Sequence, residues 1–108
     1  MKTEFRDRHD RLRYLKACET ARRLRADPRL IESARRFVED AMAPDPHQRH
    51  YTTLWRDLLA LPAETIAAAL IEDSPRGDLL RDTCPVFGRG FTSQEVAALL
   101  DADRASAP

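Results

Sequence analysis

Residues 27–62 read DPRLIESARRFVEDAMAPDPHQRHYTTLWRDLLALP, and this stretch decides the fold class. Asp27-Pro28 and Asp45-Pro46 each place an acidic residue directly before a proline, and Ser74-Pro75 repeats the arrangement with a hydroxyl. A side-chain oxygen at this position accepts hydrogen bonds from the free amides of a helix start, and a proline at the first helical position removes no needed donor. The sequence therefore predicts three helix starts at these pairs and a fourth at Pro62.

The apolar residues between these prolines recur at the spacing of one helix face. Each set forms a single stripe, as in a helix that packs against the core of a soluble protein. Residues 4–25 form a less regular helix whose apolar side chains spread around the cylinder, which predicts a bend or coverage on more than one side. No run of four or more residues alternates with period two, so no strand is expected. The two clearest stripes are Leu30, Ile31, Ala34, Phe37, Val38, Ala41 and Met42, and then Tyr51, Leu54, Trp55, Leu58 and Leu59.

Length and composition indicate one small helical domain. The chain has 108 residues, the size of a single domain, and its mixture of 43% apolar and 33% charged residues is typical of a globular protein. We predict an all-α fold, a compact, orthogonally packed bundle of five or six short helices over residues 1–101, with residues 102–108 as a flexible C-terminal tail. No apolar run reaches about 18 residues, so no membrane span is expected. The charged N-terminus does not resemble a signal peptide, so we expect a cytoplasmic protein.

Residue types that carry chemistry do not form a recognisable site. Cys18 and Cys84 are too few for a disulfide framework and lack metal-site spacing, so both are interpreted as core residues. His47 and His50 lie three apart near Asp45, which a metal site would allow, but His47 projects onto an apolar stripe. A half-buried histidine at the core edge is therefore favoured. We expect no catalytic residues, no metal, no cofactor and no enzyme activity, and a small enzyme is only the third hypothesis.

The segment FTSQEVAALL, residues 91–100, has the features of a helix start. Thr92 and Glu95 fit a capping box, and Phe91 and Val96 fit a hydrophobic staple. The segment also resembles the first half of a helix-turn-helix, which requires a second helix in the DNA major groove. Only DADRASAP follows Leu100, so we expect a structural helix. Trp55, the single tryptophan, lies on an apolar stripe and is interpreted as core, with an exposed interface anchor as the alternative.

Charge is distributed unevenly along the chain. Residues 1–36 contain 12 Lys and Arg against 6 Asp and Glu, whereas residues 37–108 contain 6 against 12. Such a split indicates either a charged partner or pairing between the two halves within the fold. It supports an alternative function, a nucleic-acid-binding transcriptional regulator that uses the arginine-rich N-terminal helices. The candidate nucleic-acid-binding residues are Arg22, Arg23, Arg25 and Arg29.

Residues 55–100 resemble a set of small all-helical bacterial proteins. The resemblance rests on WRDLLAL at 55–61 and DSPRGDLLRDTCPVFG at 73–88, which contain a Trp-Arg-x-Leu-Leu start, an Asp-Ser-x-Arg turn, a Leu-Arg pair and a Pro-x-x-Gly loop. Members of this set often lie beside nucleotidyltransferase or toxin–antitoxin-like genes. The resemblance implies a non-enzymatic protein–protein interaction module, antitoxin-like or an accessory partner in a two-gene system, whose protein partner is encoded nearby.

The same segment provides the candidate partner-binding residues, which are Arg76, Arg81, Phe87 and Arg89. An equally favoured interpretation is that residues 74–91 only fold a corner of the protein and contribute no binding surface. Self-association into a homodimer also stays open.

Overall fold

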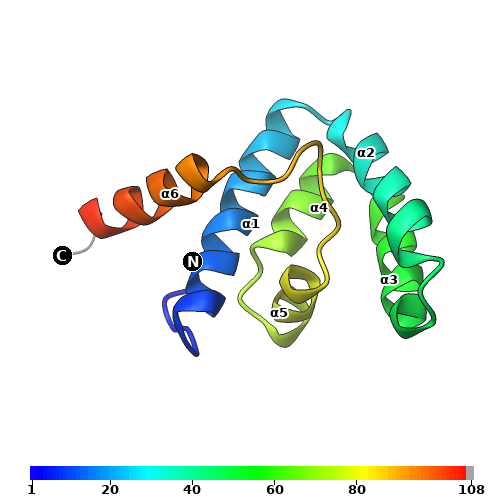
Figure 1. The fold of residues 1–108 in the computed structure, drawn as a ribbon, viewed down its shortest axis with the longest axis horizontal. Coiled ribbons are helices and arrows are strands. Elements are labelled where there is room, and N and C mark those ends of the chain that lie inside the picture. Colours follow the sequence, from blue (N-terminus) through cyan, green and yellow to red (C-terminus); the bar gives the residue numbers. More distant parts are fainter. Residues whose placement is uncertain (107–108) are drawn as a thin grey trace.

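A long helix, α1 (Arg8–Ala26), runs through the middle of the molecule in the computed structural model, which describes residues 1–106 (Figure 1). All regular structure in these residues is helical, which confirms the predicted all-α bundle. A π-helical segment, η1 (Val38–Met42), continues α2, and a 3₁₀ turn, η2 (Pro46–Gln48), leads into α3. The remaining helices are α2 (Leu30–Phe37), α3 (Arg49–Leu59), α4 (Ala63–Leu70), α5 (Pro75–Asp82) and α6 (Ser93–Ala105).

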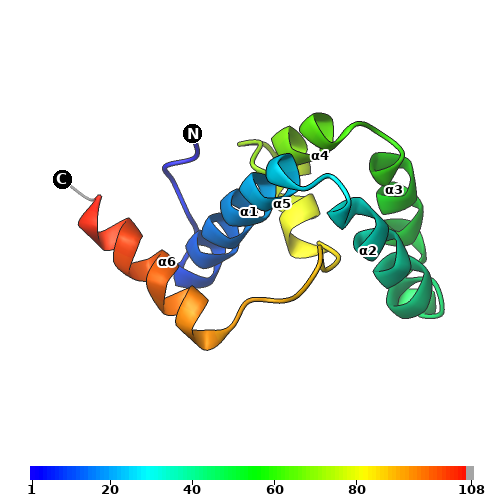
Figure 2. The same ribbon diagram turned by 90° about the horizontal axis from the view of Figure 1, so that it is seen from above.

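The other helices surround α1 unevenly. Helices α4 and α5 lie on one side of α1, α6 lies on the other, and α2 and α3 pair at the far end of the molecule (Figures 1 and 2). The structure measures 43 × 28 × 25 Å, and its radius of gyration of 13.9 Å slightly exceeds the value of about 13 Å typical of a compact chain of 100 residues. The fold is therefore compact but lengthened by α6 at one end. Coverage from two sides explains why the apolar residues of α1 do not form one stripe.

The prolines and their preceding residues mark the helix starts as predicted at two of the three pairs. The Asp45 carboxylate accepts a hydrogen bond from the His47 amide at 2.9 Å, and the Ser74 hydroxyl accepts one from the Gly77 amide at 3.0 Å. Asp27 instead ends α1, and its carboxylate accepts a bond from the Arg29 amide at 3.2 Å. A tight turn then intervenes, so α2 begins only at Leu30.

The core is formed by side chains of α1, α2, η1, α3, α4 and α5, together with Phe87. Trp55 is completely buried, and its indole N–H donates to the Thr83 hydroxyl at 3.0 Å. Its ring meets the Phe87 ring edge to face, with centroids 6.2 Å apart, a favourable aromatic geometry. This confirms Trp55 as a core residue. The other large side chains that are fully buried are Leu24, Leu59, Ile66, Leu70, Leu80 and Val38.

The environment of His47 differs from the prediction. His47 is exposed, and the expectation of a half-buried histidine at the core edge is wrong. The helical projection started at Pro46, but residues 46–48 form a 3₁₀ turn and α3 begins at Arg49. A 3₁₀ turn rotates the chain by a larger angle per residue than an α-helix does. His47 therefore does not lie on the same face as Tyr51.

The C-terminal helix is longer than the sequence indicated. Helix α6 extends to Ala105, so residues 102–105 of the predicted tail are helical, and residues 107–108 lie outside the described residues. Asp103 helps to hold this last turn, since its carboxylate accepts two hydrogen bonds from Arg11 of α1 at 2.7 Å. Sequence reasoning missed this partner because it lies 92 residues away along the chain.

Candidate functional site

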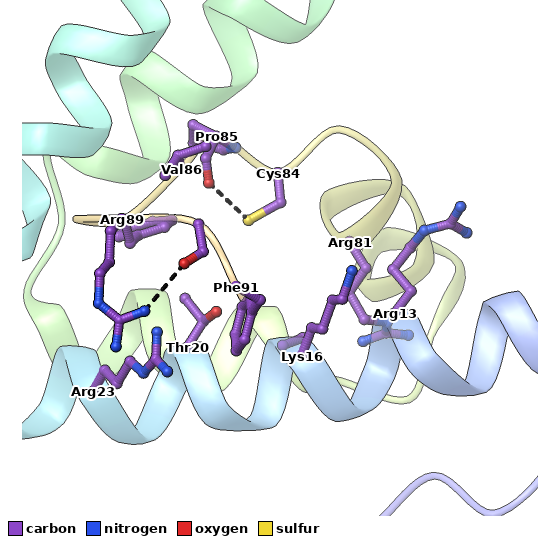
Figure 3. A pocket seen from close by; sticks show the side chains of 13 residues that line it. Arg13, Lys16, Thr20, Arg23, Arg81, Cys84, Pro85, Val86, Arg89 and Phe91 are labelled. Atoms are coloured by element: carbon purple, nitrogen blue, oxygen red, sulfur yellow. Dashed lines mark hydrogen bonds between the residues drawn. The ribbon is translucent and has the colours of Figure 1, made fainter. Parts of the chain in front are cut away.

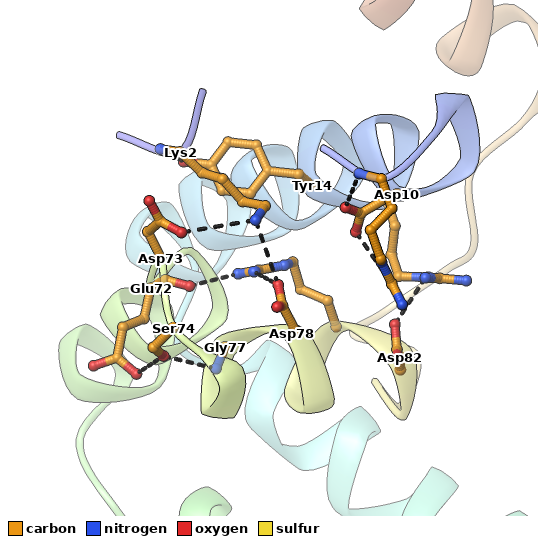
Figure 4. A network of polar contacts seen from close by, with 12 residues as sticks. Lys2, Asp10, Tyr14, Glu72, Asp73, Ser74, Gly77, Asp78 and Asp82 are labelled. Atoms are coloured by element: carbon orange, nitrogen blue, oxygen red, sulfur yellow. Dashed lines mark hydrogen bonds and ion pairs between the residues drawn. The ribbon is translucent and has the colours of Figure 1, made fainter. Parts of the chain in front are cut away.

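The segment over residues 74–91, which the sequence marked as partner-binding, begins at the corner between α4 and α5, where Arg81 bonds to the end of α4. Figure 4 shows the polar network of this corner, with Lys2, Asp73 and Asp78 close together. The Arg81 side chain is only 1% exposed. Its guanidinium donates to the carbonyl oxygens of Leu70 and Glu72 at 3.0 and 2.9 Å, and to the Asp78 carboxylate at 2.7 Å. Carbonyls at the end of a helix lack partners within the helix. Arg81 therefore satisfies the end of α4 and ties it to α5.

The N-terminal residues complete this corner. The Arg81 guanidinium lies 5.2 Å from the Tyr14 ring centroid, and the Tyr14 hydroxyl accepts a hydrogen bond from the Lys2 amide at 3.3 Å. The Lys2 ammonium is 3.7 Å from the carboxylates of both Asp73 and Asp78. Burial raises the pKa of Tyr14, so this hydroxyl stays protonated at neutral pH. The corner thus joins the N-terminus, α1, α4 and α5 into one network.

The four candidate partner-binding residues therefore have different roles. Arg81 and Phe87 are almost fully buried, so they belong to the interior and not to an outer partner-binding surface, although both line a pocket described below. Arg89 is exposed, but its guanidinium pairs with Glu95. Arg76 is exposed and has no carboxylate partner within residues 1–106. The interpretation that this segment folds a corner is thus supported for Arg81 and Phe87, because their side chains complete the core and the helix end.

The four candidate nucleic-acid-binding arginines are all paired with carboxylates. Arg22 bonds to Glu19 and Arg29 to Asp27, with shortest distances of 2.5 and 2.8 Å. The other two partners come from later helices, Glu64 for Arg25 at 2.9 Å and Glu95 for Arg23. These carboxylates offset the positive charge that would attract a phosphate. The unequal charges of the two halves are used largely within the fold, as the pairs Arg11–Asp103, Arg13–Asp82, Arg23–Glu95 and Arg25–Glu64 show.

A pocket of about 180 Å³ opens between α1, the end of α5 and the loop over residues 83–92 (Figure 3). We call it the α1 pocket. Cationic side chains stand around it, apolar side chains form much of its wall, and no carboxylate belongs to its described lining. The cations are Arg13, Lys16, Arg23, Arg81 and Arg89, and the apolar residues are Ala17, Cys84, Pro85, Val86, Phe87 and Phe91.

Lys16 differs from the other cations of the α1 pocket. The four arginines all pair with carboxylates that lie outside the lining. Lys16 has no carboxylate partner within residues 1–106, and its ammonium lies 6.0 Å from the Phe91 ring centroid. Thr20 follows one helical turn later on the same face, and its hydroxyl makes no hydrogen bond in the described part of the chain. These two groups can therefore donate hydrogen bonds to a ligand in the pocket.

Cys84 contributes a thiol to the wall of the α1 pocket. Burial raises the pKa of this thiol to about 12. The thiolate is the nucleophilic form of cysteine, so at neutral pH Cys84 acts as an apolar wall. Both cysteines are free and partly buried, but only Cys84 packs against the core, so the interpretation as a core residue holds for Cys84 and not for Cys18. Within residues 1–106, no three His, Cys, Asp or Glu side chains gather as metal ligands would, and no helix has the length and apolar character to cross a membrane.

The contact between α1 and α6 forms a second candidate site, which we call the α1–α6 seam. None of the thirteen residues of α6 is buried, although Val96, Leu99 and Leu100 are half-buried. On α1, Leu12 and Leu15 are half-buried as well and lie away from the face that packs on the core. Ion pairs join the two helices at both ends, so the helices run antiparallel.

A shallow groove follows this seam near the start of α6. Its described lining consists of Glu19, Arg23, Phe91, Glu95, Ala98 and Leu99. The predicted capping box is confirmed there, since Glu95 accepts a bond from the Thr92 amide at 3.0 Å and the Thr92 hydroxyl accepts one from the Glu95 amide at 3.1 Å. Sequence reasoning identified this helix start but missed the seam. The available signal was the spacing of Val96, Leu99, Leu100 and Asp103 on one face.

Comparisons with known proteins do not assign this fold or either site. No protein family matches the chain, and searches of curated proteins and of solved structures find no significant similarity. The resemblance of residues 55–100 to small bacterial helical proteins therefore stays a prediction, and function has to be argued from the geometry of the chain itself.

Proposed function

We propose that this chain is a non-enzymatic protein–protein interaction module and that the α1–α6 seam is its partner-binding face. The observation that carries the proposal is that α6 spans thirteen residues without burying one, and that its apolar residues Val96, Leu99 and Leu100 are only partly buried. Apolar side chains on a surface helix are stabilised when a partner removes them from water. The remainder of the apolar core is already complete without α6.

The shape of the seam favours an amphipathic helix as the partner element. Two antiparallel helices form a groove between them, and an added helix places its apolar residues in such a groove at spacings of three and four. Ion pairs at both ends of the seam, Arg11–Asp103 and Arg23–Glu95, provide a polar rim around the apolar centre. This arrangement of an apolar centre and a charged rim is typical of protein interfaces.

The resemblance of residues 55–100 supports a narrower proposal. In this proposal the chain is the antitoxin-like or accessory member of a bacterial two-gene system, and its partner is encoded by the adjacent gene. A nucleic-acid-binding role is supported less well, because Arg22, Arg23, Arg25 and Arg29 are already paired with carboxylates. Such an arginine keeps further N–H donors for a phosphate, but the neighbouring carboxylate offsets its positive charge.

The experiment is coexpression with the product of each adjacent gene, followed by copurification and measurement of the complex mass by light scattering. The test variant carries Leu99→Gln and Leu100→Gln, and the control carries Ala97→Gln at an exposed position of the same helix. We expect the double variant to weaken the complex at least tenfold and the control to leave it unchanged.

Thermal melting of the isolated chains separates a binding effect from a folding effect. Because neither leucine is buried, the double variant should melt within a few degrees of the unaltered chain. If the double variant binds the partner normally, the seam is not the interface. If a dimer of the chain itself dissociates in the double variant, the occupant of the seam is a second copy.

A further inference from the structure

We infer that the α1 pocket binds a small organic carboxylate whose apolar body is about the size of one aromatic ring. This goes beyond the proposed partner-binding role and rests on a different part of the molecule, although Arg23 and Phe91 border both the pocket and the seam. The inference combines three properties of the pocket, which are its charge, its volume and its apolar wall.

The charge of the lining selects an anion. Five cations and no carboxylate stand around the pocket in the described residues, and four of these cations are neutralised by acids outside it. Lys16 is the cation left without such a partner, and Thr20 offers a hydroxyl one turn further along α1. A lysine ammonium can donate a charge-assisted hydrogen bond to a carboxylate, and a hydroxyl can donate a neutral one.

The volume limits the size of the ligand. A buried cavity of about 150 Å³ accommodates a benzene molecule, whereas pockets for drug-sized ligands measure about 300–1,000 Å³. The pocket holds about 180 Å³, enough for one ring with a carboxylate at its mouth. A nucleotide is too large for this space. The wall supports the same conclusion, because Phe87, Phe91 and Val86 offer apolar and aromatic contacts to a ring.

The structure also supplies a reporter for binding. Phe87 lines the pocket on one side and meets the Trp55 ring on the other, with centroids 6.2 Å apart. Because Trp55 is the single tryptophan, its fluorescence reports on the packing of Phe87. A ligand that contacts Phe87 is therefore expected to change tryptophan emission in proportion to occupancy.

The experiment is a titration of the full chain with benzoate, followed by tryptophan fluorescence and by amide chemical shifts of Gly88 and Gly90. For a ligand of this size we expect saturable binding with a dissociation constant on the order of 0.1–1 mM. Acetate tests the need for a ring and benzylamine tests the need for a negative charge. Both should bind at least tenfold more weakly than benzoate.

Matched variants locate the carboxylate. Lys16→Met should weaken benzoate at least fivefold and Thr20→Val about threefold, while Arg36→Met, which removes an exposed charge on α2, should change affinity less than twofold. Ala17→Leu extends a side chain of the lining and should block binding. Leu99→Gln with Leu100→Gln alters only the seam, so it should leave benzoate binding intact whether or not the partner-binding proposal holds.

Three results would overturn the inference. They are equal affinity for benzylamine and benzoate, normal benzoate binding by a folded Lys16→Met chain, and a fluorescence change that does not saturate. If Lys16→Met or Ala17→Leu lowers the melting temperature strongly, Thr20→Val decides the question, because valine matches threonine in size and removes only the hydroxyl.

Discussion

Arg81 in the α4–α5 corner and Arg23 at the α1–α6 seam use the same contacts in different surroundings. Each pairs with a carboxylate and lies over an aromatic ring, Arg81 over Tyr14 at 5.2 Å and Arg23 over Phe91 at 4.7 Å. The Arg81 side chain is 1% exposed and that of Arg23 is 21% exposed. Arg81 also satisfies two backbone carbonyls, whereas Arg23 pairs only with carboxylates.

The difference in burial determines how much each arginine contributes to the stability of the fold. A buried charge whose partners are removed leaves unsatisfied groups in a region that water does not reach, which is strongly destabilising. An exposed pair contributes little, because water replaces either member. The corner is therefore expected to behave as part of the fold, and the seam as a surface that adjusts when a partner binds.

The largest expected effect is at Arg81. Arg81→Met removes the donors to the carbonyls of Leu70 and Glu72, and should lower the free energy of unfolding by about 3–5 kcal/mol, as measured by urea denaturation. Arg76→Met, on the exposed side of the same helix, is the matched control and should change it by less than about 0.5 kcal/mol. Similar stabilities for the two variants would contradict a structural role for Arg81.

A second comparison uses two glycines. A Cβ atom at Gly77 in the corner would lie 2.0 Å from the Glu72 carbonyl oxygen, whereas one at Gly90, in the lining of the α1 pocket, would meet no atom within 4 Å. Gly77→Ala should therefore destabilise the protein by about 1–3 kcal/mol, since the chain must shift to relieve the clash. Gly90→Ala should be neutral or slightly stabilising. Melting temperatures check both, and a harmless Gly77→Ala would show that the turn at Glu72 adapts easily.

Local signals in the sequence were sufficient for the fold class. Asp45 and Ser74 cap helices as predicted, Trp55 lies in the core, and Thr92 and Glu95 form the capping box. Each of these depends on residues within a few positions along the chain or on an apolar stripe. The predicted helix boundaries were less accurate where a turn lies between the proline and the helix, as before Leu30 and at His47. A proline favours a turn or a helix start, and its position alone does not determine which residue begins the helix.

The sites depended on contacts between distant segments, which a single sequence does not reveal. An arginine in a charged helix is expected to face water, and only the unpaired carbonyls at the end of α4 explain why Arg81 points inward. The α1 pocket likewise combines Lys16 and Thr20 of α1 with a loop some seventy residues later. The arginine-rich N-terminus was visible in the sequence, but its pairing with Glu64 and Glu95 was not.

The smallest effect concerns pH and the start of α6. The Arg89 guanidinium first, and then the Thr92 amide, hold the pKa of Glu95 well below its ordinary value of 4.5. Because the folded-state pKa is lower than the unfolded one, ionised Glu95 stabilises α6 above about pH 4.5, and this contribution is lost as the pH falls through the folded pKa. The effect should be small, since the carboxylate is in contact with water and its pairs are screened.

Carbon-13 NMR of the Glu95 side chain checks this prediction directly. We expect a titration midpoint below 4.5 in the unaltered chain and a midpoint closer to that ordinary value in Arg89→Gln, which lacks the main cause of the shift. The protection factors of the α6 amides should fall at acidic pH before those of the α4 amides do, because α4 contributes Ile66 and Leu70 to the core and α6 contributes no buried residue. If α4 and α6 respond together, the seam is as firmly joined to the fold as the corner, and a partner that docks there would meet a rigid surface.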